Sequence, residues 1–364
     1  MSREQPNIAL VHDHLIQDGG AERVLRVLSS MYPDAPIFTL LHDPKQFSDL
    51  ANREIKTSFL QRIPGSLRHY QWLLPLMPTA TEHYDLRDFD IVISSTSAFS
   101  KGVIVHPKAH HICYCHTPTR YLWTDTQEYV RELKAPGIVK RILPHYLSYL
   151  RQWDRLAAER VDTFIANSQT VKDRIRKYYQ KDAHILYPPV DTEQFHVSNE
   201  PKTYFVAGGR IVAYKRFDLV VEAANRLRVP MRIFGTGPFL DHLKERAKDN
   251  VVFLGRVSDT EKAQLYANSI AYIHPQEEDF GITAVEAMAC GRPVIAFGKG
   301  GALESVHHGV TGIHFTEQSW ESLADAMLRL SDRSFDPLVI REHAQQFSRK
   351  RFEIGMRELV QSHV

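Results

Sequence analysis

Residues 271–298 read AYIHPQEEDFGITAVEAMACGRPVIAFG, and this stretch decides the fold. A short apolar run (271–275) leads into a polar loop, a segment with helical periodicity (283–290) and a second apolar run (293–298). A strand, a crossover helix and a second strand in this order are typical of a parallel sheet. The stretch therefore predicts an α/β domain.

The same alternation extends along the chain in both directions. At 364 residues the chain exceeds the size at which one hydrophobic core stops growing, so we expect two domains. The pattern breaks near Tyr187–Asp191, which predicts a first domain over 1–190 and a second over 191–346. An amphipathic segment over 347–364 predicts a final helix, which we expect to pack back on the first domain.

The strands expected in the first domain lie at 8–13, 36–41, 90–95, 111–116 and 163–168, and those expected in the second lie at 203–209, 231–235, 251–255, 271–275 and 293–298. The expected helices of the second domain lie at 217–227, 260–267 and 283–290.

The overall composition is that of an ordinary soluble enzyme. A net charge of +2 argues against binding to nucleic acid, which needs a basic surface. The chain has three cysteines, so we expect no disulfide framework and a reducing, cytoplasmic setting. We expect neither a signal peptide nor a membrane span, because every apolar run is too short.

Local charge is more uneven. Residues 131–181 hold twelve Lys and Arg against five Asp and Glu. Apolar residues alternate with the charges, so residues 131–160 could meet the anionic inner face of a cell membrane. The alternative is a solvated basic helix face.

Two glutamates, Glu278 and Glu286, stand eight positions apart around the expected start of a helix. The free amides near Phe280, Gly281 and Ile282 form the positive end of that helix, which favours a phosphate group. The two flanking carboxylates suit the hydroxyls of a sugar and of a ribose. The alternative is a solvated loop glutamate and an ordinary first-turn glutamate.

Two basic residues, Arg210 and Lys215, follow the first expected strand of the second domain. Ligands of open α/β sheets bind outside the carboxyl ends of the strands, where these side chains fall. A guanidinium can donate hydrogen bonds to two phosphate oxygens at once, and an ammonium acts as a point charge, so together they can neutralise a diphosphate. The alternative is a pair of solvated surface residues.

The ordered set of motifs resembles the retaining family 4 glycosyltransferases of GT-B fold, and mannosyltransferases among them. The motifs, which span nearly the whole chain, are GGAERV (19–24), CHTPTRYLW (115–123), ANSQTVKDRI (166–175), GGRIVAYKR (208–216), FGTGP (234–238), EDFGITAVEAMACGRPVIA (278–296) and GGALESV (300–306). The resemblance implies two facing Rossmann-like domains with parallel sheets and a donor cleft between them.

The resemblance also implies roles for single residues. His116, Arg210, Lys215 and Glu278 would serve catalysis, with His116 beside the donor sugar as a positioning group. Glu278 would bind donor-sugar hydroxyls, Glu286 the ribose, and Arg210 and Lys215 the diphosphate. The further donor-binding candidates are Gly19, Gly20, Gly235, Phe280, Gly281 and Ile282, with Ser168 and Val257 as secondary ones. Ser168 could instead cap the helix that follows it.

The function that follows is transfer of a hexose, with retention, to a lipid-linked or polysaccharide acceptor such as lipopolysaccharide. The expected donor is GDP-mannose, and no metal or other cofactor is expected. One alternative is a soluble transferase that uses a UDP- or ADP-sugar and a small acceptor. Another is a non-catalytic scaffold that binds nucleotide sugars. A nicotinamide enzyme is a poor alternative, because Leu240 replaces the third glycine of the dinucleotide fingerprint that FGTGP begins.

Overall fold

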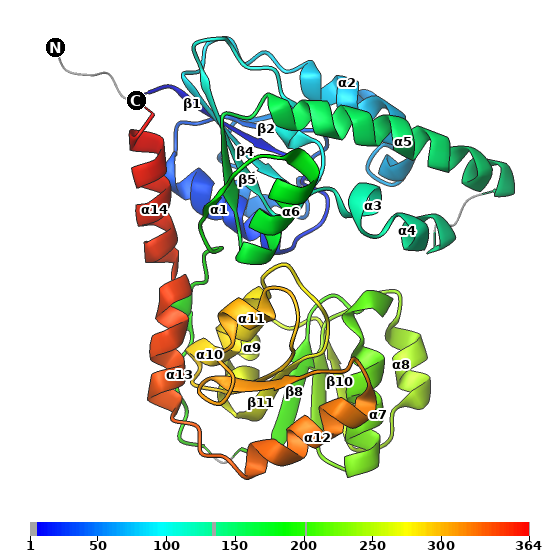
Figure 1. Cartoon of the computed structure of the whole chain (residues 1–364), viewed down its shortest axis with the longest axis vertical. Coiled ribbons are helices and arrows are strands. Elements are labelled where there is room, and N and C mark those ends of the chain that lie inside the picture. Colours follow the sequence, from blue (N-terminus) through cyan, green and yellow to red (C-terminus); the bar gives the residue numbers. More distant parts are fainter. Residues whose placement is uncertain (1–5, 133–135, 201, 364) are drawn as a thin grey trace. The chain divides into compact units, whose positions relative to one another are not determined.

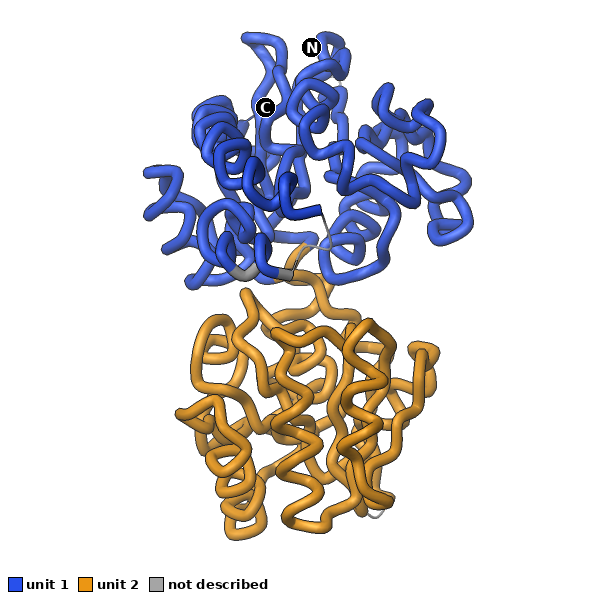
Figure 2. The backbone as a smooth tube through the Cα atoms, turned by 90° about the vertical axis from the view of Figure 1, so that its right-hand side faces the viewer, with its two compact units in different colours: residues 1–187, 353–364 blue, residues 188–352 orange. Residues whose placement is uncertain are grey.

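The computed structural model describes residues 6–132, 136–200 and 202–363. The chain divides into two compact units (Figure 2). Unit 1 comprises residues 1–187 and 353–364, and unit 2 comprises residues 188–352. The sequence places this boundary after residue 190 and begins the final segment at residue 347. In the structure, the part of the last helix from residue 353 onward belongs to unit 1.

Unit 1 is built on a seven-stranded sheet in which all neighbouring strands pair in parallel, in the order β3-β2-β1-β4-β5-β6-β7. The strands are β1 (Ile8–His12), β2 (Ile37–Thr39), β3 (Ile55–Thr57), β4 (Ile91–Thr96), β5 (His110–Cys115), β6 (Thr163–Ala166) and β7 (His184–Ile185). All five strands expected in this half are present. The sequence does not reveal β3 and β7, because these short edge strands are largely exposed and carry no apolar run.

Helices flank the sheet of unit 1 (Figure 1). The α-helices are α1 (Gly20–Met31), α2 (Met77–Glu82), α3 (Arg120–Trp123), α4 (Thr126–Glu132), α5 (Gly137–Glu159), α6 (Gln169–Tyr179) and α14 (Arg349–Gln361), whose residues from 353 belong to this unit. The 3₁₀ turns are Ser48–Leu50, Phe59–Arg62, Tyr70–Leu76 and Ser100–Gly102. Near the end of α14, the ring of His363 stacks on His110 of β5 at 3.8 Å.

Unit 2 repeats the plan with six parallel strands in the order β10-β9-β8-β11-β12-β13. The strands are β8 (Tyr204–Gly208), β9 (Met231–Phe234), β10 (Val251–Gly255), β11 (Ser269–His274), β12 (Val294–Phe297) and β13 (Gly312–Phe315). The α-helices are α7 (Phe217–Leu227), α8 (Leu240–Arg246), α9 (Asp259–Ala267), α10 (Ile282–Ala289), α11 (Ala302–Ser305), α12 (Trp320–Ser331) and α13 (Pro337–Ala344). The 3₁₀ turns are Thr192–Gln194, Ala213–Lys215 and Gln345–Phe347. The sequence predicts α7 with its observed bounds and misses β13.

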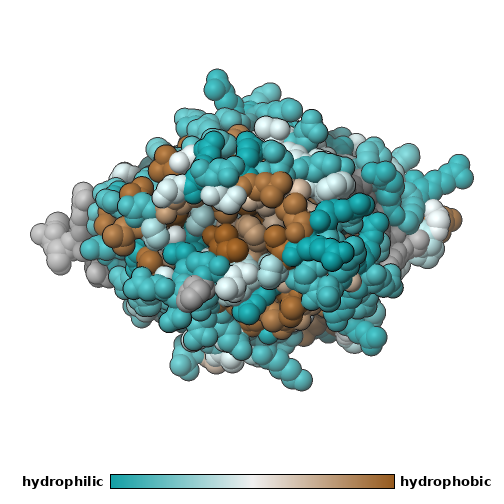
Figure 3. All heavy atoms as spheres, turned by 90° about the horizontal axis from the view of Figure 1, so that it is seen from below, coloured by the Kyte–Doolittle hydropathy of each residue, from teal (hydrophilic) through white to brown (hydrophobic). Residues whose placement is uncertain are grey.

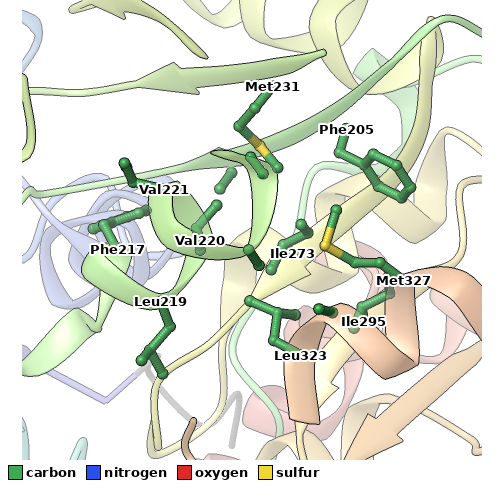
Figure 4. Close-up of a cluster of buried hydrophobic side chains, with 14 of the residues drawn as sticks. Phe205, Phe217, Leu219, Val220, Val221, Met231, Ile273, Ile295, Leu323 and Met327 are labelled. Carbon is green, nitrogen blue, oxygen red and sulfur yellow. The ribbon is translucent and has the colours of Figure 1, made fainter. Parts of the chain in front are cut away.

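The core of unit 2 lies between its sheet and the helices α7 and α12 (Figure 4). Phe205, Ile273 and Ile295 project from three strands, and Leu323 and Met327 meet them from α12. Each of these side chains is at most 6% exposed. Burial of one such side chain contributes about 1.5 to 3 kcal/mol, so this layer fixes the sheet that carries the loops described below.

The surface is mostly hydrophilic on the face shown in Figure 3, where apolar side chains gather near the centre of the view. Scattered apolar side chains are normal on folded proteins. Within the part of the chain that the structure describes, no helix combines the length and the apolar character needed to cross a bilayer.

A buried carboxylate, Asp13, organises the loop that follows β4. The side chain is 6% exposed, and its two oxygens accept hydrogen bonds from four consecutive backbone amides, those of residues 97–100. The hydroxyls of Thr96 and Ser100 donate to it as well. Burial by itself raises the pKa of Asp13, but His12 and the amide hydrogen bonds outweigh burial and lower the pKa to about 2.

We expect Asp13→Asn to weaken unit 1, because an amide replaces one acceptor oxygen by a donor that faces N–H groups. The pKa falls from 3.8 to about 2 on folding, so Asp13 stabilises the protein above pH 3.8 and loses this contribution as pH falls through about 2. The linked free energy of unfolding is about 2 kcal/mol. Urea unfolding between pH 7 and pH 2.5 measures this free energy through tryptophan fluorescence, since Trp72, Trp123 and Trp153 lie in unit 1.

The control is Asp332→Asn, at an exposed position of unit 2. An unchanged pH dependence in Asp13→Asn would refute this role.

Candidate functional site

An ion pair between Lys215 and Glu278 forms the centre of the candidate site in unit 2. The lysine ends the 3₁₀ turn after β8, and the glutamate lies in the loop between β11 and α10. Their nitrogen and oxygen are 3.2 Å apart, with side chains 17% and 20% exposed. Burial, the largest single effect, lowers the pKa of Lys215, but the charge and hydrogen bond of Glu278 together with Tyr214 and Tyr272 outweigh burial and raise it. The ammonium therefore remains charged in a partly desolvated place, where charge interactions are strong.

Two glycines of the GGALESV motif hold the loop that carries Glu278. The amide of Gly301 donates to the carbonyl of Glu278 at 2.8 Å. A Cβ atom on Gly300 would lie 2.4 Å from that carbonyl oxygen, and one on Gly301 would lie 2.4 Å from the carbonyl oxygen of Asp279. Larger residues cannot pack here without moving the loop, so this motif serves to position Glu278.

The start of α10 follows the same loop. Gly281 is its N-cap residue, with a φ of 90° that favours glycine, and no side chain caps the helix. Such a start presents backbone N–H groups and the positive end of the helix dipole. The side chain of Phe280 is buried against Phe347, so only its backbone can serve a ligand. These features suit an anionic group near residues 280–282.

Tyr272 of β11 connects the parts of this site. Its hydroxyl lies 3.0 Å from the carbonyl oxygen of Gly208 and 2.9 Å from Oγ1 of Thr283 in α10. Burial raises its pKa to about 12. The charges of Lys215, Glu278 and Glu286 all act on this pKa, which places the three groups around one tyrosine.

Glu286 is 1% exposed and already has protein partners. Its Oε1 lies 3.1 Å from Nζ of Lys262, and its Oε2 accepts from the hydroxyl of Tyr266 at 3.1 Å. Both partners come from α9. Residue type and spacing do not reveal these partners, although a buried glutamate requires a compensating partner. Ribose hydroxyls, the expected ligands, would have to share these carboxylate oxygens.

The FGTGP turn packs against the loop that contains Arg210. A Cβ atom on Gly235 would lie 1.9 Å from the carbonyl oxygen of Gly209, and Gly235 has a φ of 112°. The amide of Ile211 donates to Thr236 at 2.9 Å. Gly235 therefore permits a close approach of two backbone segments. Arg210 is exposed on this loop.

Val257 lies after the edge strand β10, beside a cavity of about 340 Å³. Arg232, Arg256 and Tyr204 line the same cavity. The guanidinium of Arg232 lies 3.8 Å from the ring centre of Tyr204. Val257 thus borders a basic and aromatic hollow, separate in sequence from the loops that carry Lys215 and Glu278.

In unit 1, His116 follows β5 and is 9% exposed. Its Nε2 lies 2.8 Å from Oγ of Ser95, and the side chain of Asn167 donates to its carbonyl oxygen at 2.9 Å. Burial lowers the pKa of His116 to about 4, so the ring is neutral near pH 7. A neutral imidazole suits the expected positioning role.

The segment after His116 is held by Asp154 of α5, a residue that no sequence motif singles out. Its Oδ1 accepts from Thr119 at 2.9 Å and lies 2.5 Å from Nζ of Lys101, and both charged side chains are 1% exposed. Its Oδ2 accepts from the indole of Trp123 at 2.7 Å and from Tyr179 at 2.8 Å. This buried network fixes the CHTPTRYLW segment against α5.

The remaining candidates lie at helix starts in unit 1. Gly19 is the N-cap residue of α1, and Gly20 begins that helix. The φ of Gly19 is −158°, which any residue can adopt, so a need for glycine there would come from space. Ser168 is fully buried, and its hydroxyl caps α6 by accepting from the amide of Val171 at 3.1 Å. The capping alternative is thus observed for Ser168.

Two family models match the chain. "Glycosyltransferase Family 4" matches residues 18–194, and "Glycosyl transferases group 1" matches residues 190–351. Among the relatives, the alpha-1,3/1,6-mannosyltransferase ALG2 of Dictyostelium discoideum is 24% identical over 84% of this chain and 85% of its own length. The O-antigen chain mannosyltransferase C of Escherichia coli is 27% identical over 54% of this chain and 56% of its own length.

Solved structures show the same fold. Anabaena Alr3699/HepE, in complex with UDP and glucose, has a TM-score of 0.72 at 20% identity and covers 98% of this chain and 100% of its own. Sucrose-phosphate synthase from Thermosynechococcus elongatus has a TM-score of 0.74 at 18% identity and covers 98% of this chain and 99% of its own. The two family matches together span residues 18–351, and with the paired parallel sheets they place this chain in the family 4 glycosyltransferases of GT-B fold.

Proposed function

We propose that the protein transfers mannose from GDP-mannose to a lipid-linked or polysaccharide acceptor, with retention of the anomeric configuration and without a metal. Relatives named as mannosyltransferases support the sugar, including an O-antigen chain enzyme. The observation that carries the catalytic part is the partly buried pair of Lys215 and Glu278 in the loops beside the start of α10.

In this proposal, the charge of Lys215 stabilises the diphosphate as it leaves the sugar. Arg210 on the neighbouring loop and the amides at residues 280–282 add to this positive potential. Preorganised charge of this kind is usually the largest single contribution to catalysis. Glu278, held by Lys215, is then placed to accept hydrogen bonds from donor-sugar hydroxyls, and Glu286 together with Lys262 forms the ribose side.

Retention follows if the acceptor attacks the face that the diphosphate leaves. The bond between the anomeric carbon and the phosphate oxygen breaks first, and the departing oxygen takes the proton of the acceptor hydroxyl. We propose that the neutral His116 positions a sugar hydroxyl in this step and does not remove the proton. Its low pKa, due mainly to burial, supports a neutral ring.

Incubation with a panel of GDP-, UDP- and ADP-sugars tests the function. We expect turnover with GDP-mannose, and Lys215→Ala should raise the barrier by about 2 to 4 kcal/mol because a preorganised charge is lost at the leaving group. Lys244→Ala, at an exposed lysine of α8, is the control.

Unchanged turnover in Lys215→Ala would refute the role of the lysine. Turnover with a UDP- or ADP-sugar and a small acceptor would instead favour the soluble alternative, since the neighbours with similar folds include a UDP complex and a sucrose-phosphate synthase. Donor binding by calorimetry with no hydrolysis and no transfer would favour a scaffold.

We further propose that helix α5 contacts the inner face of an anionic membrane. Ile138, Ile142, Tyr149 and Leu156 follow one another at helical spacing and are each 59% to 69% exposed. Arg141 is exposed beside them. An apolar stripe with basic neighbours suits an anionic lipid surface. Within the segment 131–160 expected to make this contact, residues 133–135 lie outside the described residues.

Flotation with vesicles that contain phosphatidylglycerol tests this contact. The double variant Ile138→Ser with Ile142→Ser should bind at least about tenfold more weakly, because the burial of one such side chain is worth ~1.5 kcal/mol or more. Leu328→Ser, at a 57% exposed position of α12, is the control. No binding of the unmodified protein at physiological salt would contradict the membrane proposal.

A further inference from the structure

A chain of four buried polar side chains ends at His116. The Oε1 of Glu22 lies 3.3 Å from Nε2 of His12, and Nδ1 of His12 lies 3.2 Å from Oγ of Ser95. Oγ of Ser95 lies 2.8 Å from Nε2 of His116. The four residues are between 0% and 9% exposed, so water does not compete freely for these contacts.

The parallel sheet brings these residues together. His12 ends β1, and its Cα pairs with that of Ser95 in β4. Ser95 pairs in turn with Tyr114 of β5, and His116 lies two residues further, on the same face as Tyr114. Glu22 reaches the group from the first turn of α1. Residues from four elements thus converge through backbone register.

Ser95, in the middle of this series of hydrogen bonds, restricts where the protons lie. The hydroxyl of Ser95 has one proton and lies between two histidine nitrogens, so it donates to one and accepts from the other. Burial, the largest single effect, raises the pKa of Glu22, but the hydrogen bond and charge of His12, a backbone hydrogen bond and the charge of His14 together lower it, so this end of the series is a carboxylate. His12 therefore donates from Nε2 to Glu22.

When His12 is neutral, the proton of each of these three hydrogen bonds points toward Glu22. Nδ1 of His12 is then bare and accepts from the hydroxyl of Ser95, which accepts in turn from Nε2–H of His116. The other ring nitrogen of His116, Nδ1, is left without a proton. Among the described residues, no hydrogen-bond partner contacts this nitrogen.

We propose that Glu22, His12 and Ser95 are positioning residues that keep the proton of His116 on Nε2, so that Nδ1 accepts a hydrogen bond from a hydroxyl of the sugar substrate. The proposal deepens the proposed function and rests on it for the identity of the ligand. The placement of the proton follows from the geometry of the four side chains together with an ionised Glu22 and a neutral His12.

The direction of this series of hydrogen bonds depends on the charge of His12. An imidazolium at His12 would donate from Nδ1 to Ser95, and Ser95 would then donate to a bare Nε2 of His116. The proton of His116 would move to Nδ1, which would become a donor in place of an acceptor. The charged and titratable groups around His12 are Glu22 from α1, Asp13 and His14 after β1, and His116 after β5.

The tautomer can be measured without any substrate. In protein labelled with ¹⁵N-histidine, long-range nitrogen–proton spectra at pH 7.5 should show His116 protonated on Nε2, with the signal assigned by its loss in His116→Gln. Ser95→Ala should convert it to a mixture of tautomers or to the Nδ1–H form. Protonation on Nδ1 in the unmodified protein would overturn the proposal.

Strand β4, which carries Ser95, also provides a matched control. Ser94 points to the opposite face of β4 and makes an equally long bond, 2.8 Å, to Nε2 of the buried His111. Ser94→Ala therefore carries a comparable structural cost without touching the chain to His116. It should leave the His116 tautomer unchanged, whereas an equal change in both variants would show a general loosening of the sheet and overturn the proposal.

Kinetics test how the tautomer is used. Ser95→Ala should lower kcat on the order of 10- to 100-fold, as for outer partners that orient functional histidines, with little change in donor KM. In a His116→Gln background the same substitution should add little, because both changes remove one interaction. Additive losses in the double variant would overturn the coupling.

These measurements separate the two proposals. If the tautomer is as expected and no sugar is transferred from any donor, the chain to His116 stands and the proposed function fails. If sugar is transferred and the tautomer is the opposite one, the function stands and the positioning role fails.

Discussion

Parallel hydrogen bonding between neighbouring strands brings the carboxyl ends of a whole sheet to one edge, and the polar groups of each unit depend on this constraint. In unit 1 the register of β1, β4 and β5 aligns His12, Ser95 and His116. In unit 2 the ends of β8 and β11 lead into the loops of Lys215 and Glu278. These side chains are distant in sequence and would not meet without the ladder.

Close backbone contacts in unit 2 determine how accurately the charged groups can be placed. Gly235 lets one loop approach Gly209, and Gly300 and Gly301 let another approach Glu278. Because no Cβ atom separates these segments, the loops have little freedom to shift. The Lys215–Glu278 pair is thus held by backbone packing as well as by charge, which suits a group that must act without reorganisation.

Three buried carboxylates in unit 1 each hold a different group in place. Asp13 fixes the loop after β4 through four amides, and Asp154 holds the segment after His116 with the compensating charge of Lys101. Glu22 is bound by a histidine instead. Amides and lysine can only donate hydrogen bonds to a carboxylate, whereas a neutral histidine donates from one ring nitrogen and accepts at the other. Glu22 can therefore act on His116 through His12 and Ser95, whereas Asp13 and Asp154 hold the segments that they contact directly.

The sequence by itself determined the fold class, most strands, the family and the residues of the unit 2 loops, because apolar periodicity and ordered motifs are local properties of the chain. It did not reveal β3, β7 or β13, which are short and lie at or near sheet edges. Only the tertiary structure decided that Glu286 meets Lys262 and that Asp154 and Glu22 reach the segments around His116. Each of these contacts joins groups through burial or strand register. Residue type and spacing do not identify the partner of a buried charge or the register of two strands that are distant in sequence.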